Sequence, residues 1–120
     1  MNAALIAAAF VCAHPYAVDG DTLRCAGFGL VRLLGIDAPE MPGHCRPGRV
    51  CTPGDGRASK AALARRVKAG PVTCDARGRD RYGRMLARCA AGGADLSCAQ
   101  IKTGAAVRRY GWISCRRGAR

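Results

Sequence analysis

Residues 31–40 read VRLLGIDAPE, an apolar run that carries one arginine near its start and two acids near its end. Residues 30–34 are predicted to form a half-buried strand. An arginine on such a strand needs an anionic partner if it points inward, and the alternative is a solvent-facing position. Because Pro39 restricts the backbone, Glu40 can face back towards Asp37. The stretch therefore predicts a strand that delivers two carboxylates to one place.

A turn that contains two acids precedes this strand. Residues 18–22 read VDGDT, and Asp-Gly is a strong signal for a tight turn. Residues 10–17 and 22–25 flank the turn and are predicted strands, with Pro15 placing the first at a sheet edge or a bulge. With residues 30–34 they form a predicted meander of three strands.

The second half of the chain is predicted to add two strands and two helices. The strands are residues 71–74 and 85–89, and the helices are residues 57–69 and 94–103. Asp55 is the expected N-cap of the first helix, which follows a loop rich in proline and glycine. Because strands and helices do not alternate, the predicted fold class is α+β, mainly β, as a small closed β-barrel with packed helices.

The charge of the chain favours a polyanionic partner. The 120 residues suit one domain, and 20 Lys and Arg against 8 Asp and Glu give a formal net charge of +12. Seventeen of the 20 cations are arginine, which makes bidentate contacts to phosphate. A GC-rich genome also inflates arginine, but it need not deplete acids. The balance indicates nucleic acid as the partner.

The eight cysteines indicate disulfides. The chain has no C-x-x-C pair and only two histidines, which argues against a zinc site. An even count without metal spacing indicates four bridges in an oxidising compartment, so the protein is expected to be secreted or periplasmic. The positions of the cysteines around predicted turns and a short loop, with the last two paired by elimination, predict Cys12–Cys25, Cys45–Cys51, Cys74–Cys89 and Cys98–Cys115.

The first residues permit two interpretations. Residues 1–9 are apolar and resemble the end of a secretory signal, and the alternative is that they begin the first strand. Residues 10–120 are expected to form a single domain. No stretch is long enough to span a membrane.

Three polar segments together indicate phosphoryl chemistry. The third segment, residues 80–84, reads DRYGR. Acids at turns and strand ends can hold a hard divalent cation such as Ca2+, which prefers oxygen ligands. Arginines beside them can clamp a phosphodiester. Each segment alone has an ordinary explanation, as a hairpin turn, a strand exit or a solvated arginine, but the three in one chain indicate hydrolysis.

These segments resemble those of the staphylococcal-nuclease-like family, also called thermonuclease. The family shows a DGDT turn, an R-L-x-G-I-D-[AT]-P-E strand and a D-[RK]-Y-G-R hairpin, in the order seen here. The resemblance covers residues 18–112. It implies a five-stranded barrel of OB type with helices. It also implies Ca2+-dependent hydrolysis of DNA and RNA that leaves 3′-phosphate ends. The eight cysteines depart from the family's best-known member, which has none.

The resemblance also implies a role for individual residues. The implied catalytic residues are Arg32, Glu40 and Arg84, with Glu40 as general base and the arginines stabilising charge on the phosphate. The implied metal ligands are Asp21, Asp37 and the backbone carbonyl of Ala38, with Asp19 contacting the site indirectly. The implied substrate-binding residues are Arg81, Tyr82, Tyr110 and Trp112.

Two other functions are alternatives to the nuclease. The first is a non-catalytic nucleic-acid-binding module of OB type, against which the complete set of implied catalytic residues argues. The second is a basic, disulfide-rich peptide that acts on anionic membranes, and no long amphipathic helix supports it. The expected partners are therefore DNA and RNA, with single-stranded or locally unpaired regions preferred, and the protein is expected to be a monomer.

Overall fold

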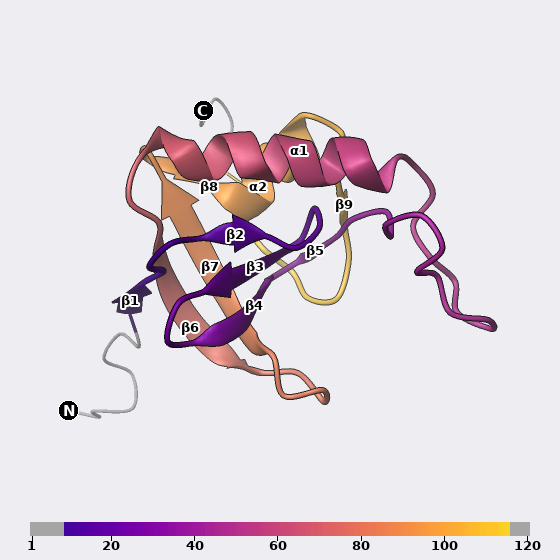
Figure 1. The fold of residues 1–120 in the computed structure, drawn as a ribbon, viewed down its shortest axis with the longest axis horizontal. Helices are drawn as coiled ribbons and strands as arrows, with labels where there is room; N and C mark the ends of the chain where they lie inside the picture. Colours follow the sequence, from indigo (N-terminus) through magenta and orange to yellow (C-terminus); the bar gives the residue numbers. More distant parts are fainter. Residues whose placement is uncertain (1–8, 116–120) are drawn as a thin grey trace.

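A computed structural model describes residues 9–115 of the chain, so residues 1–8 of the signal-like segment lie outside it. The strands are β1 (Ala9–Val11), β2 (Tyr16–Ala17), β3 (Thr22–Cys25), β4 (Gly29–Leu33), β5 (Ile36–Asp37), β6 (Thr73–Arg79), β7 (Met85–Ala91), β8 (Ala94–Asp95) and β9 (Val107–Arg108). The helices are α1 (Gly56–Arg66), the short 3-10 helix η2 (Val67–Ala69) and α2 (Leu96–Lys102). The predicted α+β class, mainly β with two α-helices, is confirmed (Figure 1).

Strand β4 lies near the middle of the main sheet, whose order is β1-β6-β7-β4-β3-β2, with β8 also paired to β7. On one side β4 runs antiparallel to β3, with Arg32 opposite Thr22. On the other side it runs parallel to β7, with Arg32 opposite Leu86. Asp21 precedes Thr22 by one residue, and Arg84 precedes Leu86 by two. This register therefore brings both residues towards Arg32 from opposite sides.

All five predicted strands lie in this sheet, but the first is divided. Residues 12–15 separate β1 from β2, and His14 has a positive φ of 48°. As a result β1 and β2 occupy opposite ends of the strand order, in agreement with the edge position expected from Pro15. The linking residues bond beside β6 and beside β3: the Cys12 N–H donates to the Val72 carbonyl, just before β6, and the Ala13 carbonyl accepts from the Ala26 N–H, just after β3.

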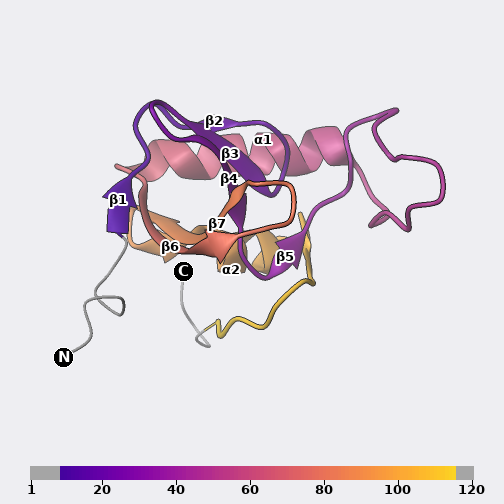
Figure 2. The same ribbon diagram turned by 90° about the horizontal axis from the view of Figure 1, so that it is seen from below.

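The two helices lie together on one side of the strands (Figures 1 and 2). Helix α1 begins where expected, and the Asp55 carboxylate accepts a hydrogen bond from the Ala58 N–H at 3.1 Å. The predicted start of the second helix at residue 94 was wrong. Residues 94–95 pair with β7 as β8, and Asp95 then caps α2 by accepting from the Cys98 N–H at 2.8 Å. Among residues 9–115, no helix combines the length and apolar character needed to cross a bilayer.

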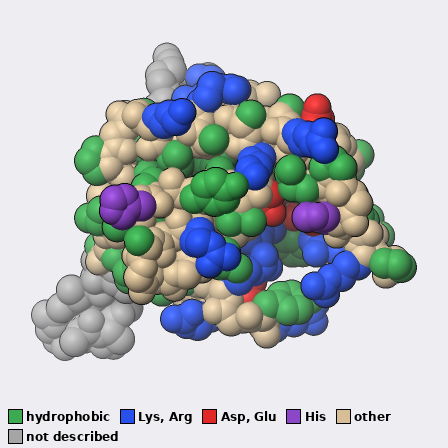
Figure 3. All heavy atoms as spheres, viewed as in Figure 1, with side chains coloured by type: hydrophobic (Ala, Val, Ile, Leu, Met, Phe, Trp, Pro, Cys, Tyr) green, Lys and Arg blue, Asp and Glu red, His purple; other side chains and the backbone are tan. Residues whose placement is uncertain are grey.

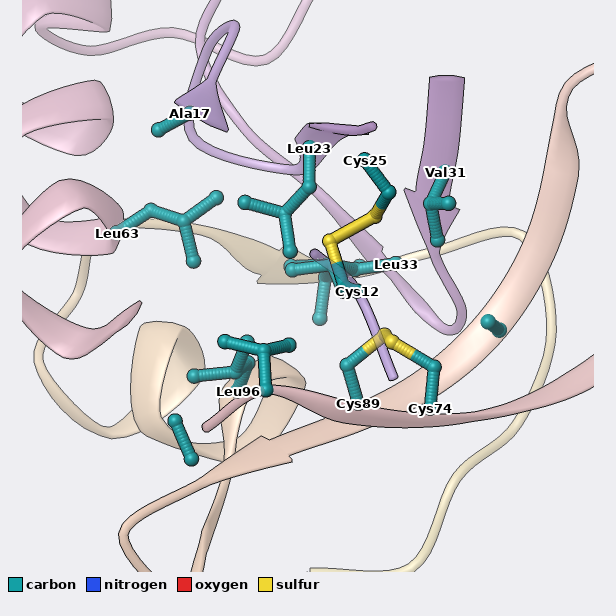
Figure 4. Packing of buried hydrophobic residues seen from close by; sticks show 14 of the residues in the cluster. Cys12, Ala17, Leu23, Cys25, Val31, Leu33, Leu63, Cys74, Cys89 and Leu96 are labelled. Carbon is teal, nitrogen blue, oxygen red and sulfur yellow. A yellow bond between two sulfur atoms is a disulfide. The ribbon is translucent and has the colours of Figure 1, made fainter. Parts of the chain in front are cut away.

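The core contains leucines from the sheet and from both helices, together with two disulfides. Leu23, Leu33, Leu63 and Leu96 are fully buried, and Figure 4 shows the Cys12–Cys25 and Cys74–Cys89 bridges among the core side chains. All four predicted disulfides are present, with Cys45–Cys51 closing a loop and Cys98–Cys115 attaching the C-terminal segment to α2. In a protein with a small core, each bridge adds about 2–4 kcal/mol to the free energy of unfolding.

Gln100 is a buried polar side chain that connects α2 to two other parts of the fold. Its Nε2 donates to the Gly20 carbonyl at 2.8 Å and to the Ser59 carbonyl at 3.1 Å. Gly20 belongs to the acid-containing turn and Ser59 to α1. One side chain therefore holds the turn, α1 and α2 together.

Replacing Gln100 by Leu is expected to destabilise the fold. Two carbonyls lose a buried donor, which costs about 1–3 kcal/mol in the free energy of unfolding. Urea denaturation measures this change. Lys102→Ala, an exposed change on the same helix, serves as the control and should stay within about 0.5 kcal/mol. A Gln100→Leu protein as stable as the parent would contradict the assignment.

Candidate functional site

The Arg32 side chain is the centre of the site. It is only 7% exposed, and its Nη1 lies 3.3 Å from Asp21 Oδ2 while its Nη2 lies 3.1 Å from Asp37 Oδ1. Nη1 also donates to the Ile36 carbonyl at 3.0 Å. A buried guanidinium requires such partners. The inward-pointing alternative for Arg32 is therefore the observed one.

Asp21 is held by the residues of both acidic segments. Its Oδ2 accepts from the Ala38 N–H at 2.8 Å and its Oδ1 accepts from the Thr22 hydroxyl at 2.8 Å. Asp19 lies just outside and accepts from the Asp21 N–H at 3.0 Å. Burial raises the pKa of Asp21 to about 6, because the Arg32 charge only partly offsets the loss of water.

Asp37 is 1% exposed and has more cationic partners than Asp21. In addition to Arg32, its Oδ2 accepts from the Thr52 hydroxyl at 2.6 Å and lies 3.4 Å from Arg109 Nη1. Arg49 Nη2 approaches its Oδ1 at 3.9 Å. The loop after Glu40 and the segment after β9 therefore both converge on this one carboxylate.

Glu40 is positioned by backbone packing and by one arginine. Gly56, the first residue of α1, packs so closely that a Cβ there would overlap the Glu40 carbonyl oxygen. The Glu40 Oε2 lies 3.5 Å from Arg49 Nη2. Desolvation acts to lower the pKa of Arg49, but the nearby negative charges, led by Glu40, outweigh it and raise that pKa above its usual value.

The hairpin between β6 and β7 presents Arg84. Asp80 accepts from the Tyr82 N–H and the Arg84 N–H, each at 2.9 Å, and its Oδ2 lies 2.7 Å from Arg84 Nε. Partial burial acts to raise the pKa of Asp80, but these hydrogen bonds and the Arg84 charge outweigh it, so the pKa is lowered. The guanidinium groups of Arg81 and Arg84 lie 5.5 and 5.7 Å from the Tyr82 ring centre.

Two adjoining cavities contain nearly all the predicted site residues. The first, of about 530 Å³, is called here the acidic cavity and is lined by Asp19, Asp21, Leu30, Arg32, Asp37, Glu40, His44, Arg46, Arg49, Tyr82 and Arg84. The second, of about 510 Å³, is called the aromatic cavity and is lined by residues that include Arg81, Tyr82 and Tyr110. Both cavities are lined by Arg32, Arg46, Arg49, Tyr82 and Arg84. Figure 3 shows acidic side chains set back in a recess whose rim carries Lys and Arg side chains.

Two predicted site residues, Trp112 and Ala38, line neither cavity. Trp112 is 82% exposed. Ala38, the predicted backbone ligand, is buried between the two acids and bonds Asp21 through its N–H. The other members of the predicted set meet because β4 lies between the turn and the hairpin.

The oxygen donors of the site suit a hard cation. Within residues 9–115, no three His, Cys, Asp or Glu side chains are grouped closely enough to hold a metal by themselves. A cation bound by Asp21 and Asp37 would therefore need a backbone carbonyl and water as further ligands, which Ca2+ accepts. Asp21 is buried, so its charge has lost most of its contact with water, and a bound cation would offset that cost.

Sequence reasoning missed three residues that contact the acids: Arg49, Thr52 and Arg109. Arg49 and Thr52 flank Cys51 in the loop after Glu40, and the predicted Cys45–Cys51 bridge was a signal that this loop stays near the site. Arg109 follows β9, which pairs with β5, the strand that contains Asp37. No local pattern marks Arg109, because its contact depends on that long-range pairing.

Comparison with known proteins yields a family and a relative. Residues 30–117 match the family described as Staphylococcal nuclease homologue. The chain is also 39% identical, over 94 residues, to the protein named "Succinoglycan biosynthesis protein ExoI" of Rhizobium meliloti (strain 1021). That alignment covers 77% of this chain and 49% of the relative, so the chain spans about half the length of the curated relative it matches.

A methyl group at Gly20 is expected to disturb the site. Gly20 has no positive φ, and its requirement is steric, because a Cβ would overlap Ser59 Oγ and lie 2.8 Å from Ala38 Cβ. Gly20→Ala should therefore lower the free energy of unfolding by about 1–3 kcal/mol, as measured by thermal or urea unfolding.

A double-mutant cycle with Ser59→Gly provides the control for this steric explanation. The double variant should be more stable than the sum of the single changes by about 0.5–3 kcal/mol, because the overlap with Ser59 is removed. Strictly additive effects would show that close packing is not the reason for glycine at position 20.

Proposed function

The chain belongs to the staphylococcal nuclease homologue family, and we propose that it is a nuclease that hydrolyses phosphodiester bonds in DNA and RNA and leaves 3′-phosphate ends. One observation carries this proposal. Arg32 joins Asp21 and Asp37 in the acidic cavity, and the same cavity receives Glu40 and Arg84 from separate parts of the chain. A potential base, a pair of oxygen donors for a cation and two arginines thus share one space.

The charge and shape of the site support a single-stranded nucleic-acid substrate. The net charge of +12 attracts a polyanion, and the two adjoining cavities supply arginines together with Tyr82 and Tyr110. Aromatic rings stack on bases with little preference for sequence. Bases must be unpaired to reach such rings, so single-stranded or locally unpaired regions are the proposed substrate.

Each residue of the site would have a separate role in the reaction. Glu40 would accept a proton from the attacking water at its carboxylate. Arg32 and Arg84 would donate N–H groups to the phosphoryl oxygens as charge develops on them. A Ca2+ held by Asp21, Asp37 and the Ala38 carbonyl would supply Lewis-acid polarisation of the phosphate. The Arg84 side chain is partly exposed and bonds Asp80 through its Nε, so its other two guanidinium nitrogens can bind the phosphate.

Three further features belong to this proposal. The sheet is proposed to close as an OB-type barrel, supported by the bonds that residues 12–13 make to Val72, before β6, and to Ala26, after β3. The protein is proposed to act as a monomer. Its compartment is proposed to be the periplasm or the cell exterior, supported by four disulfides, which are typical of oxidising compartments.

A non-catalytic nucleic-acid-binding module is the second candidate function. The observation that favours it is that Glu40 and Arg84 are each engaged by another side chain, Arg49 and Asp80 respectively. A base occupied by an arginine is a weaker base until that arginine moves. Activity of point variants separates the two candidates.

Cleavage is expected to require Ca2+. Labelled single-stranded DNA or RNA incubated with the protein should be cut when Ca2+ is present, because hard carboxylate ligands suit that ion. The 3′ ends of the products should be ligated to a 5′-phosphorylated adaptor only after phosphatase treatment, because ligation needs a 3′-hydroxyl, and this identifies 3′-phosphate ends. Excess chelator should abolish cutting. Full turnover in chelator would remove the metal from the proposal.

Glu40→Gln and Arg84→Ala are expected to lose turnover but to keep binding. Glu40→Gln should lower kcat by about 10²–10⁴-fold and Arg84→Ala by about 10²–10³-fold, since both act mainly in the transition state. Affinity for single-stranded DNA, measured in chelator, should change little because the basic surface remains.

Arg65→Ala is the matched control, since Arg65 is exposed on α1 and lines neither cavity. It should cleave like the parent. If Glu40→Gln also cleaves like the parent, Glu40 is a loop residue only and the binding module becomes the leading function.

A further inference from the structure

The loop after Glu40 is closed by a disulfide and attached to the site at two points. Cys45 and Cys51 close a loop with a separation of six residues. The Val50 carbonyl accepts from Arg109 Nη1 at 3.3 Å, and the Thr52 hydroxyl donates to Asp37 Oδ2 at 2.6 Å. The end of the loop is therefore held against the buried acids. Arg49 lies inside the closed loop, one residue before Val50.

The loop presents the Arg49 guanidinium to both cavities. Its Nη2 lies 3.5 Å from Glu40 Oε2 and 3.9 Å from Asp37 Oδ1, and the residue is part of both linings. The Arg49 side chain is 40% exposed. The Arg49 guanidinium is thus placed where a nucleic-acid strand passing from the aromatic cavity to the acidic cavity would run.

We propose that Arg49 is a substrate-binding residue whose guanidinium binds a non-bridging oxygen of the phosphodiester entering the acidic cavity, in exchange for the Glu40 carboxylate. This inference rests on the proposed function only in taking nucleic acid as the ligand. It does not depend on whether that ligand is cut.

The exchange of Glu40 for phosphate costs little. The Arg49–Glu40 pair is partly exposed, and ion pairs at the surface are worth about 0–1 kcal/mol, whereas arginine binds phosphate with two parallel hydrogen bonds. Arg32 is less free to make this exchange, because Asp21, Asp37 and the Ile36 carbonyl hold it in a buried position. Among the arginines that contact the acids, Arg49 is the most exposed.

Binding through Arg49 would also release the Glu40 carboxylate, because the guanidinium that lies 3.5 Å from Glu40 Oε2 would turn to the phosphate. The Cys45–Cys51 bridge orders the loop before binding, which reduces the entropy lost on association.

The test measures affinity without turnover. Binding of a fluorescent single-stranded DNA oligonucleotide is titrated in chelator at several salt concentrations for the parent, Arg49→Ala, Arg49→Lys and Arg65→Ala. Arg49→Ala should weaken the Kd by about tenfold and reduce the slope of log K against log salt by about 0.7, the value for one phosphate contact on a single strand. Arg49→Lys should recover part of the affinity.

A second variant tests the loop itself. The double change Cys45→Ser and Cys51→Ser keeps Arg49 but releases the loop, and it should weaken binding in the same direction by a smaller factor. Thermal unfolding of each variant confirms that it is folded at the assay temperature. Where the parent cleaves, Arg49→Ala should raise KM more than it lowers kcat.

The outcomes separate this inference from the proposed catalysis. If Arg49→Ala binds no more weakly than Arg65→Ala, Arg49 is not a substrate-binding residue, whatever the parent's activity. If the parent does not cleave but Arg49→Ala still loses affinity and salt slope, the catalytic proposal fails and the role of Arg49 stands.

Discussion

The rest of the site depends on the ion pairs that the buried Arg32 guanidinium makes with two acids. Arg32 lies on β4, between the turn that supplies Asp21 and the strand that follows Arg84, and it pairs with Asp21 and Asp37 together. Removing one partner of such a pair leaves an uncompensated buried charge, which is strongly destabilising. The acids cannot separate without exposing the arginine, so the packing of the sheet and the geometry of the site are a single constraint.

Close backbone approach keeps this arrangement in place. Gly20 packs on Ser59 of α1, and Gly56 packs on the Glu40 carbonyl, so the first helix lies against both acidic segments. Gln100 then connects the turn and α1 to α2. The disulfides add bridges to a core made of few large side chains, and two of them lie among the core leucines. Small residues and cross-links thus provide the rigidity that a charged site requires.

Most strands and both helices could be predicted, because they carry local signals. The strand periodicity, the Asp55 cap and the turn glycines act within a few residues. The predictions were wrong where pairing partners decide the structure. Residues 94–95 read as the start of a helix, but they pair with β7, and the first strand divides because its two parts join opposite ends of the sheet. Gly20 was expected as a turn former, and its actual requirement is space.

The sequence by itself determined which candidate groups the chain carries: Asp21, Arg32, Asp37, Glu40 and Arg84 occur in three motifs, on which the proposal of phosphodiester hydrolysis rests, and the even cysteine count indicated four bridges. Only the tertiary structure decided which of these groups meet and what else joins them. Arg49, Thr52 and Arg109 reach the same acids from a disulfide-closed loop and from the segment after β9. Their contacts are long-range and depend on how the strands pair. No local pattern records such contacts, because a side chain's neighbours across a fold are set by packing and not by its position along the chain.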